Sequence, residues 1–271
     1  MTYRVLKTLA CILLLYGCSG RPPAPVNKYG GNEGNTSYNT PANRPPLPGK
    51  GNNRSNSSDR PPLPGQGGVT AQEKIKAEVG THSSGKLTGQ EVFKRCNTAV
   101  FMVFTSTGSQ MFQGSGFFVS PNGLAVSNYH VFEGTGMGLE VIKTVNDQKY
   151  KIDQVVFKDK ENDVIAFTVK AASGTKFNYI PISSHAPQVG EKVYAIGSPR
   201  GLENTFSSGE ISQFRENGSI IQTSAPFDHG SSGGALINEY GEVIGITSGG
   251  YDNSGANLNF AVNINVVKNR L

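Results

Sequence analysis

Three polar side chains have the types and surroundings needed for nucleophilic catalysis. Ser232 lies in a glycine-flanked run, GSSGG, directly before an apolar strand-like stretch. His130 lies in VSNYHVF, and Asp163 opens the apolar run DVIAFTV. A serine becomes a strong nucleophile when a histidine accepts its proton and a carboxylate orients that histidine. The order His, Asp, Ser along the chain therefore predicts acyl transfer through a covalent intermediate.

Each of these residues also has a purely structural explanation when it is taken alone. His130 alone is better explained as a core or helix-start histidine. Asp153 and Asp159 compete with Asp163 as the orienting carboxylate. Asp163 is the stronger candidate because it opens an apolar strand, where a buried carboxylate needs a partner. The combination of the three residues favours catalysis.

The glycines around Ser232 fit the same chemistry. Glycine permits backbone angles that let main-chain amides point at a developing oxyanion. We expect the oxyanion hole in the backbone of Gly230, Ser231 and Ser232, with the amides of Gly230 and Ser232 as the donors.

Short β-branched and aromatic runs, separated by Gly, Asn and Pro, recur through the second part of the chain and predict an all-β fold. The 176 residues from 96 to 271 suffice for two small barrels. The clearest expected strands are Ala99–Thr105, Leu139–Thr144, Val193–Ile196, Ser219–Thr223 and Val243–Thr247.

Together, several motifs resemble the trypsin-like protease domain of the HtrA/Deg family. They are GSGFFVS at 114–120, VSNYHV at 126–131, DVIAF at 163–167, AIGSPRGL at 195–202, TFSSGEIS at 205–212, GSSGGALIN at 230–238 and GEVIGI at 241–246. The chain departs from the family at Ser231, where Asn or Asp is usual, and at Ala235, where many relatives have Pro. The alanine that follows Asp163 lies one position later than is usual in the family. No PDZ domain is expected after the protease domain.

The resemblance implies a chymotrypsin-like fold of two six-stranded β-barrels, at about 96–182 and 183–271, within a protease domain at 87–271. His130 and Asp163 would come from the first barrel and Ser232 from the second, with the seam near Pro181–Pro187. It also implies a serine endopeptidase that acts on unfolded or extended polypeptides in envelope protein quality control.

By the same resemblance, the primary specificity pocket would lie between Ala225–His229 and Thr247–Gly249. Pro226, His229, Thr247, Ser248 and Gly249 are the expected substrate-binding residues. Pro226 stands six residues before Ser232, where cleavage after Lys or Arg would require an aspartate. We therefore expect cleavage after small or medium apolar residues.

The first part of the chain is expected to deliver and tether the protease. Residues 1–17 have a basic start and a short apolar run, typical of a signal peptide, and Leu15-Tyr16-Gly17-Cys18 resembles a bacterial lipobox. Lipid on Cys18 would anchor the protein to a membrane of the bacterial envelope, on its periplasmic or cell-surface face. Residues 18–86 are rich in Pro, Gly and Asn and predict a disordered tether.

The net charge of +5 belongs to the signal and tether: residues 1–95 hold 13 Lys and Arg against 5 Asp and Glu, which leaves 12 against 15, or −3, for the remainder. An acidic protease domain argues against nucleic acid as a partner. Cys96 has no disulfide partner once Cys11 leaves with the signal and Cys18 is lipidated. His82, His130, His185 and His229 have no paired-ligand spacing, so we expect no metal and no cofactor.

Two other functional classes remain open from the sequence. One is a catalytically silent protease fold that binds extended peptides; the other is an envelope structural protein that acts through its proline-rich tether. Relatives commonly trimerise through segments before the first barrel. The expected helix at Thr88–Arg95, capped by Thr88, would serve a trimer contact or close the barrel.

Overall fold

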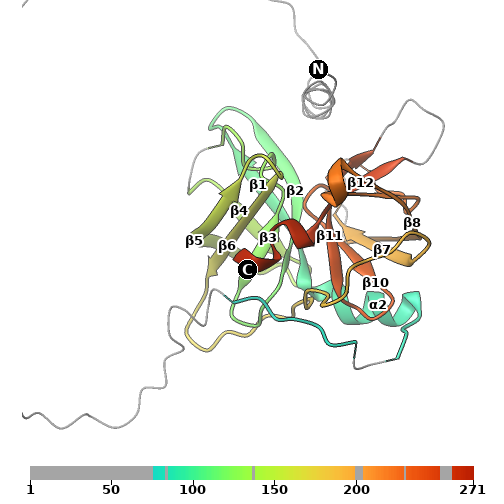
Figure 1. Cartoon of the computed structure of the whole chain (residues 1–271). Coiled ribbons are helices and arrows are strands. Elements are labelled where there is room, and N and C mark those ends of the chain that lie inside the picture. The colour runs from blue at the N-terminus through green and yellow to red at the C-terminus, as the bar shows by residue number, and fades with distance from the viewer. Residues whose placement is uncertain (1–75, 83–84, 136–137, 199–203, 229, 251–257) are drawn as a thin grey trace, which may run out of the picture. The chain divides into compact units, whose positions relative to one another are not determined.

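The computed structural model describes residues 76–82, 85–135, 138–198, 204–228, 230–250 and 258–271. Within these ranges, twelve strands form two closed antiparallel barrels of six strands each (Figure 1). The expected all-β, chymotrypsin-like double barrel is confirmed. The predicted signal peptide, Cys18 and most of the predicted tether lie outside the described residues.

The first barrel closes in the order β1-β2-β3-β6-β5-β4. Its strands are β1 (Val100–Ser106), β2 (Met111–Phe118), β3 (Leu124–Ser127), β4 (Val141–Thr144), β5 (Lys149–Asp159) and β6 (Val164–Lys170). β5 pairs with both β4 and β6, and its register against β6 shifts twice, between Ile152 and Gln154 and between Val155 and Phe157. Such bulges bend a long strand, which allows the sheet to curl and close.

The second barrel closes in the order β10-β11-β12-β9-β8-β7. Its strands are β7 (Lys192–Gly197), β8 (Thr205–Arg215), β9 (Ile220–Thr223), β10 (Ala235–Asn238), β11 (Val243–Gly250) and β12 (Asn259–Asn263). Short 3-10 turns follow β8, at Glu216–Gly218, and β12, at Ile264–Val266 and Lys268–Arg270. All five strands expected from the sequence are present, with ends shifted by a few residues.

Each barrel has an apolar interior, and a third cluster fills the space between the barrels. Phe101, Phe118 and Phe167 pack inside the first barrel, where the Phe101 and Phe118 ring centroids lie 4.7 Å apart. Ile211, Ile221, Leu236 and Ile244 lie inside the second. The third cluster joins residues of both barrels to the helix that precedes them. The two barrels therefore share a core.

The helix α2 (Gly89–Cys96) confirms the expected capping by Thr88 and is followed by a 3-10 turn at Asn97–Ala99. The Thr88 hydroxyl accepts from the Glu91 amide at 3.3 Å, and the Glu91 carboxylate accepts from the Thr88 amide at 2.8 Å, a capping box. Val92 and Cys96 are buried in the shared core, so the helix closes the gap beside the barrels. Within the described ranges, no helix has the length and apolar character needed to cross a membrane.

The expected end of the disordered tether at residue 86 is wrong for residues 76–82, which we call the strap. The strap amides of Ala77, Glu78 and Gly80 donate to the carbonyls of Leu271, Val119 and Ile182, each at 2.8 Å. Val79 forms a parallel bridge with Ile182, which bridges in turn to Val243 in β11. Main-chain groups can pair whatever the side chains are, so the composition of residues 76–82 does not reveal that they dock on the barrels. The sequence therefore predicts a tether there.

Candidate active site

His130 and Asp163 are brought together by two neighbouring strands. β3 ends shortly before His130, β6 begins directly after Asp163, and the two strands pair with Ser127 opposite Ile165. Asp163 Oδ2 lies 2.8 Å from His130 Nδ1, and Asp163 Oδ1 accepts from the His130 main-chain amide at 2.8 Å. Because an ionised carboxylate can only accept, Nδ1 carries the proton and Nε2 is left as an acceptor.

The backbone of Asp163 is held as firmly as its carboxylate. Its φ of 55° lies in the left-handed region, which costs free energy for a residue other than glycine. Its carbonyl accepts from the Asn128 side-chain amide at 3.0 Å and from the Tyr129 main-chain amide at 3.1 Å. Asn128 is fully buried, and sequence reasoning missed it. Its position two residues before His130 is the feature of the sequence that could have identified it.

Ser232 lies in the second barrel, in the loop just before β10. Its Oγ donates to the main-chain carbonyl of Ser248 at 2.9 Å, and the Ser248 hydroxyl donates to Asp163 Oδ2 at 3.3 Å. Ser248, expected only as a substrate-binding residue, thus links the nucleophile candidate to the orienting carboxylate. Within the described ranges, no hydrogen bond joins Ser232 to His130, so the serine hydroxyl faces Ser248 in this structure.

The loop before Ser232 presents two unused amides. Among the described residues, neither the Gly230 nor the Ser232 amide donates a hydrogen bond, so both donors are available to a ligand. The Ser231 amide donates to the Asp228 carbonyl at 3.0 Å. Ser231 was expected in the backbone of the oxyanion hole, with the amides of Gly230 and Ser232 as the donors; the Ser231 amide is committed to the turn and is not available to substrate.

Gly233 allows this loop to pack against the first barrel. Its φ is 89°, and a Cβ at this position would overlap the carbonyl oxygen of Ser115 and the hydroxyl of Ser127. Glycine is therefore required both by the backbone angle and by the close approach.

A pocket of about 370 Å³ lies beside the loop that leads to Ser231. The expected residues Pro226 and Thr247 line it; Gly249 lies on β11 outside the lining, and His229 lies outside the described residues. Asp228 is the only ionisable residue among the described lining residues. The lining is completed by Ala195, Ile196, Gly197, Thr205, Phe206, Ser207, Phe227 and Ser231.

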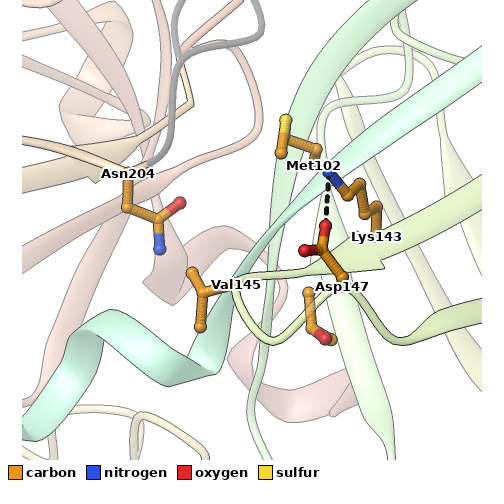
Figure 2. Close-up of a pocket in the computed structure, with 6 residues that line it drawn as sticks. Met102, Lys143, Val145, Asp147 and Asn204 are labelled. Atoms are coloured by element: carbon orange, nitrogen blue, oxygen red, sulfur yellow. Dashed lines mark ion pairs between the residues drawn. The ribbon is translucent and has the colours of Figure 1, made fainter.

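A second hollow, of about 10 Å³, lies between the barrels and has room for about one water molecule (Figure 2). Lys143 Nζ pairs with Asp147 Oδ1 at 2.6 Å on one side, and Asn204 lies on the other. None of the candidate catalytic residues lines this hollow, so it adds nothing to the site.

Among the described residues, Cys96, His82 and His185 provide no second reactive centre. Burial raises the pKa of the Cys96 thiol to about 12. His82 contacts the buried Glu242, with 2.7 Å between Nε2 and Oε2, and its ring stacks on His185. No cluster of three or more His, Cys, Asp or Glu residues suited to a metal ion occurs in the described part of the chain.

Comparison with known proteins agrees with the double-barrel fold. Residues 114–246 match the trypsin-like peptidase domain. Residues of this chain are 35% identical to Protease Do-like 1, chloroplastic, of Arabidopsis thaliana over 167 residues, which is 57% of this chain and 37% of the relative. They are 36% identical to a probable periplasmic serine endoprotease, DegP-like, of Halomonas elongata over 161 residues, 56% of this chain and 33% of the relative. Residues 114–246 are an HtrA/Deg-like, trypsin-like peptidase domain.

The fold of this peptidase domain also matches a solved structure, the serine endoprotease from Yersinia pestis. The TM-score is 0.60 at 26% sequence identity, over 69% of this chain and 66% of that chain. The chain spans about a third of the length of the two curated relatives above. The peptidase domain is therefore the part of this protein that is similar to these relatives.

Proposed function

We propose that this protein is a serine endopeptidase in which Ser232 is the nucleophile, His130 the general base and Asp163 the residue that orients His130. The observation that carries the proposal is the pair of 2.8 Å contacts from Asp163 to the His130 ring and amide, with Ser248 joining Asp163 to Ser232. The likeness to serine endoproteases, and the match of residues 114–246 to the trypsin-like peptidase domain, support it.

The proposed reaction begins with a turn of the Ser232 hydroxyl from Ser248 to His130 Nε2. Catalytic hydrogen bonds are often formed only when substrate is bound. Ser232 Oγ attacks the scissile carbonyl as His130 takes its proton, and the amides of Gly230 and Ser232 stabilise the oxyanion. His130 passes the proton to the leaving amine. Water then hydrolyses the acyl-enzyme with His130 as base, which regenerates Ser232.

Ser248 provides a place for the substrate backbone in this scheme. The register of β11 against β12 shifts between Thr247 and Gly249, which leaves Ser248 outside the ladder. Its carbonyl loses the Ser232 hydroxyl when that hydroxyl turns to His130. We propose that the amide of an extended substrate then donates to the Ser248 carbonyl, so that the substrate itself favours the reactive orientation of Ser232.

The proposed substrates are unfolded or extended polypeptides, cleaved after small or medium apolar residues, in envelope protein quality control. The absence of a basic-residue-binding aspartate at Pro226 supports apolar specificity. The lipobox-like run ending at Cys18 supports lipid anchoring in the envelope, and the DegP-like relative of Halomonas elongata is described as probably periplasmic. Assembly into a homo-oligomer such as a trimer belongs to the same proposal.

One observation favours a second candidate, a catalytically silent domain that holds extended peptides. The Ser232 hydroxyl faces Ser248 rather than His130. If peptide binding does not turn this hydroxyl, the nucleophile stays unactivated and the site binds without cleaving.

The test compares casein cleavage by the full chain with cleavage by Ser232→Ala. Removing the nucleophile of a working triad lowers kcat about a millionfold, so only the parent should cleave. Ser183→Ala is the control, because the Ser183 hydroxyl bonds to the main chain of His185, away from the site. A folded parent that neither cleaves casein nor reacts with a fluorophosphonate at Ser232 would reject the protease and support the peptide-binding domain.

A further inference from the structure

The hydroxyl of Ser115 connects the first barrel to the loop that carries the nucleophile. Ser115 lies on β2, which runs along the side of the first barrel that faces the second (Figure 1), and it is fully buried. Its Oγ accepts from the Ser198 amide at the end of β7 at 2.9 Å and donates to the Gly230 carbonyl at 2.7 Å. One hydroxyl thus bonds to two segments of the second barrel.

These bonds fix the peptide plane between Gly230 and Ser231. The Gly230 carbonyl and the Ser231 amide belong to the same trans peptide and point in opposite directions. Ser115 holds the carbonyl, and the Asp228 carbonyl holds the amide at 3.0 Å. A rotation of this peptide would break both hydrogen bonds and would free the amides on either side of it to change their relative orientation.

The next peptide plane is fixed independently from within the second barrel. The Ser231 carbonyl accepts from the Thr247 hydroxyl at 2.6 Å and from the Gly234 amide at 2.9 Å. The amides of Gly230 and Ser232 lie at the two ends of this doubly fixed segment. Through the Gly230 carbonyl, the Ser115 hydroxyl is therefore a contribution of the first barrel to the orientation of these two amides relative to one another.

Ser115 itself has little freedom to move. Its amide donates to the Ser232 carbonyl at 2.8 Å, and its own carbonyl accepts from the Ser127 hydroxyl at 2.7 Å. Because the side chain is sealed from solvent, a lost hydroxyl would leave the Ser198 amide and the Gly230 carbonyl without a partner from bulk water.

We propose that Ser115 is a positioning residue for the oxyanion hole: its hydroxyl fixes the Gly230–Ser231 peptide and makes the donor geometry depend on the docking of the two barrels. The catalytic part of this inference rests on the proposed function. Ser115 touches neither His130 nor Asp163 through a hydrogen bond among the described residues, so its effect is separable from that of the base.

The decisive variant is Ser115→Ala in the full chain, assayed on a peptide substrate that the parent cleaves. Misplaced donors lower the rate of the chemical step, so kcat should fall ten- to a hundredfold with KM within threefold. The pH midpoint of kcat/KM should stay where it is in the parent, because the histidine and its carboxylate are untouched. Ser183→Ala, the same substitution at an equally buried serine, should keep kcat within threefold.

Amide hydrogen exchange gives a readout that does not need activity. In Ser115→Ala, exchange should quicken at residues 230–234 and not in the strands of the first barrel. Ser115→Cys keeps nearly the same volume with a weaker donor and should show a smaller effect; it decides the matter if the alanine variant fails to fold. A parent that is inactive while local exchange still quickens overturns the proposed function and supports the positioning of the loop by Ser115.

Two results would overturn the inference. One is a folded Ser115→Ala with kcat within threefold of an active parent and unchanged exchange at 230–234. The other is a loss of activity accompanied by faster exchange throughout both barrels and a shifted pH midpoint, which shows a general loss of structure.

Discussion

At the scale of single residues, the candidate site depends on polar groups that hold backbone atoms. Asn128 is the clearest case: its amide nitrogen donates to the Asp163 carbonyl at 3.0 Å, while its Oδ1 is buried without a partner among the described residues. An unmet buried acceptor costs about 1–3 kcal/mol. The hydrogen bond from its amide nitrogen therefore fixes the orientation of the Asn128 side chain. The same bond helps to hold Asp163 in its left-handed backbone conformation.

Cys96 offers a prediction at this scale. Burial raises the pKa of Cys96 to about 12, so the fraction of this residue present as thiolate at neutral pH is roughly a thousandfold lower than for an exposed cysteine. The thiolate is the reactive form. Iodoacetamide should leave Cys96 unmodified in the folded protein and alkylate it after unfolding in guanidinium, as measured by mass spectrometry of the peptide that contains it. Rapid alkylation of Cys96 in the folded protein would show that α2 does not seal this position.

At the scale of elements, α2 begins where a local capping signal places it and then serves the tertiary structure. The buried residues Val92 and Cys96 face the shared core, and the Phe93 ring meets Phe206 of β8 edge to face at 5.5 Å. A short helix has little stability of its own, so it needs both its cap and this packing.

Thr88→Ala should lower the free energy of unfolding by about 1 kcal/mol, because it removes the side chain that accepts from the Glu91 amide. Chemical denaturation measures the loss. Thr175→Ala is the matched control, since the Thr175 side chain makes no hydrogen bond among the described residues and should change stability by less than about 0.5 kcal/mol. Equal effects of the two substitutions would argue against the capping box as a source of stability.

At the scale of the whole molecule, the strap contacts both barrels and the segment that connects them. Ile182, between the barrels, pairs with the strap on one side and with β11 on the other. At the end of the strap, the Glu242 carboxylate, 3% exposed, accepts from the His82 amide at 3.0 Å and contacts the His82 ring. A shortened chain must keep residues 76–82 to retain these contacts.

His82→Ala should lower the free energy of unfolding by about 2–3 kcal/mol, because a buried carboxylate loses its ring partner. Lys86→Ala is the comparison: its 2.6 Å pair with Glu239 is exposed, and exposed pairs contribute little. Thermal and chemical unfolding of the two variants measure the difference. If His82→Ala unfolds with the same midpoint as Lys86→Ala, the strap does not stabilise the barrels.

The sequence by itself determined features that depend on short stretches of chain. The Thr88 cap, the glycines around Ser232 and the strand-like runs each act within a few residues, so their positions could be predicted. The motifs around His130, Asp163 and Ser232 also predicted the double barrel through their resemblance to a family, and the fold is confirmed. The catalytic roles of these three residues stay predictions.

Only the tertiary structure decided which distant groups meet. Ser115 meets Gly230, Ser248 meets Asp163 and the strap meets Ile182 because closure of two barrels brings together residues far apart in the chain. A buried serine hydroxyl or a paired main-chain amide leaves no periodic or compositional pattern. The bond from the Ser231 amide to the Asp228 carbonyl could not be predicted for the same reason, since the direction of a peptide plane is set by the partners that surround it and not by its own residue type.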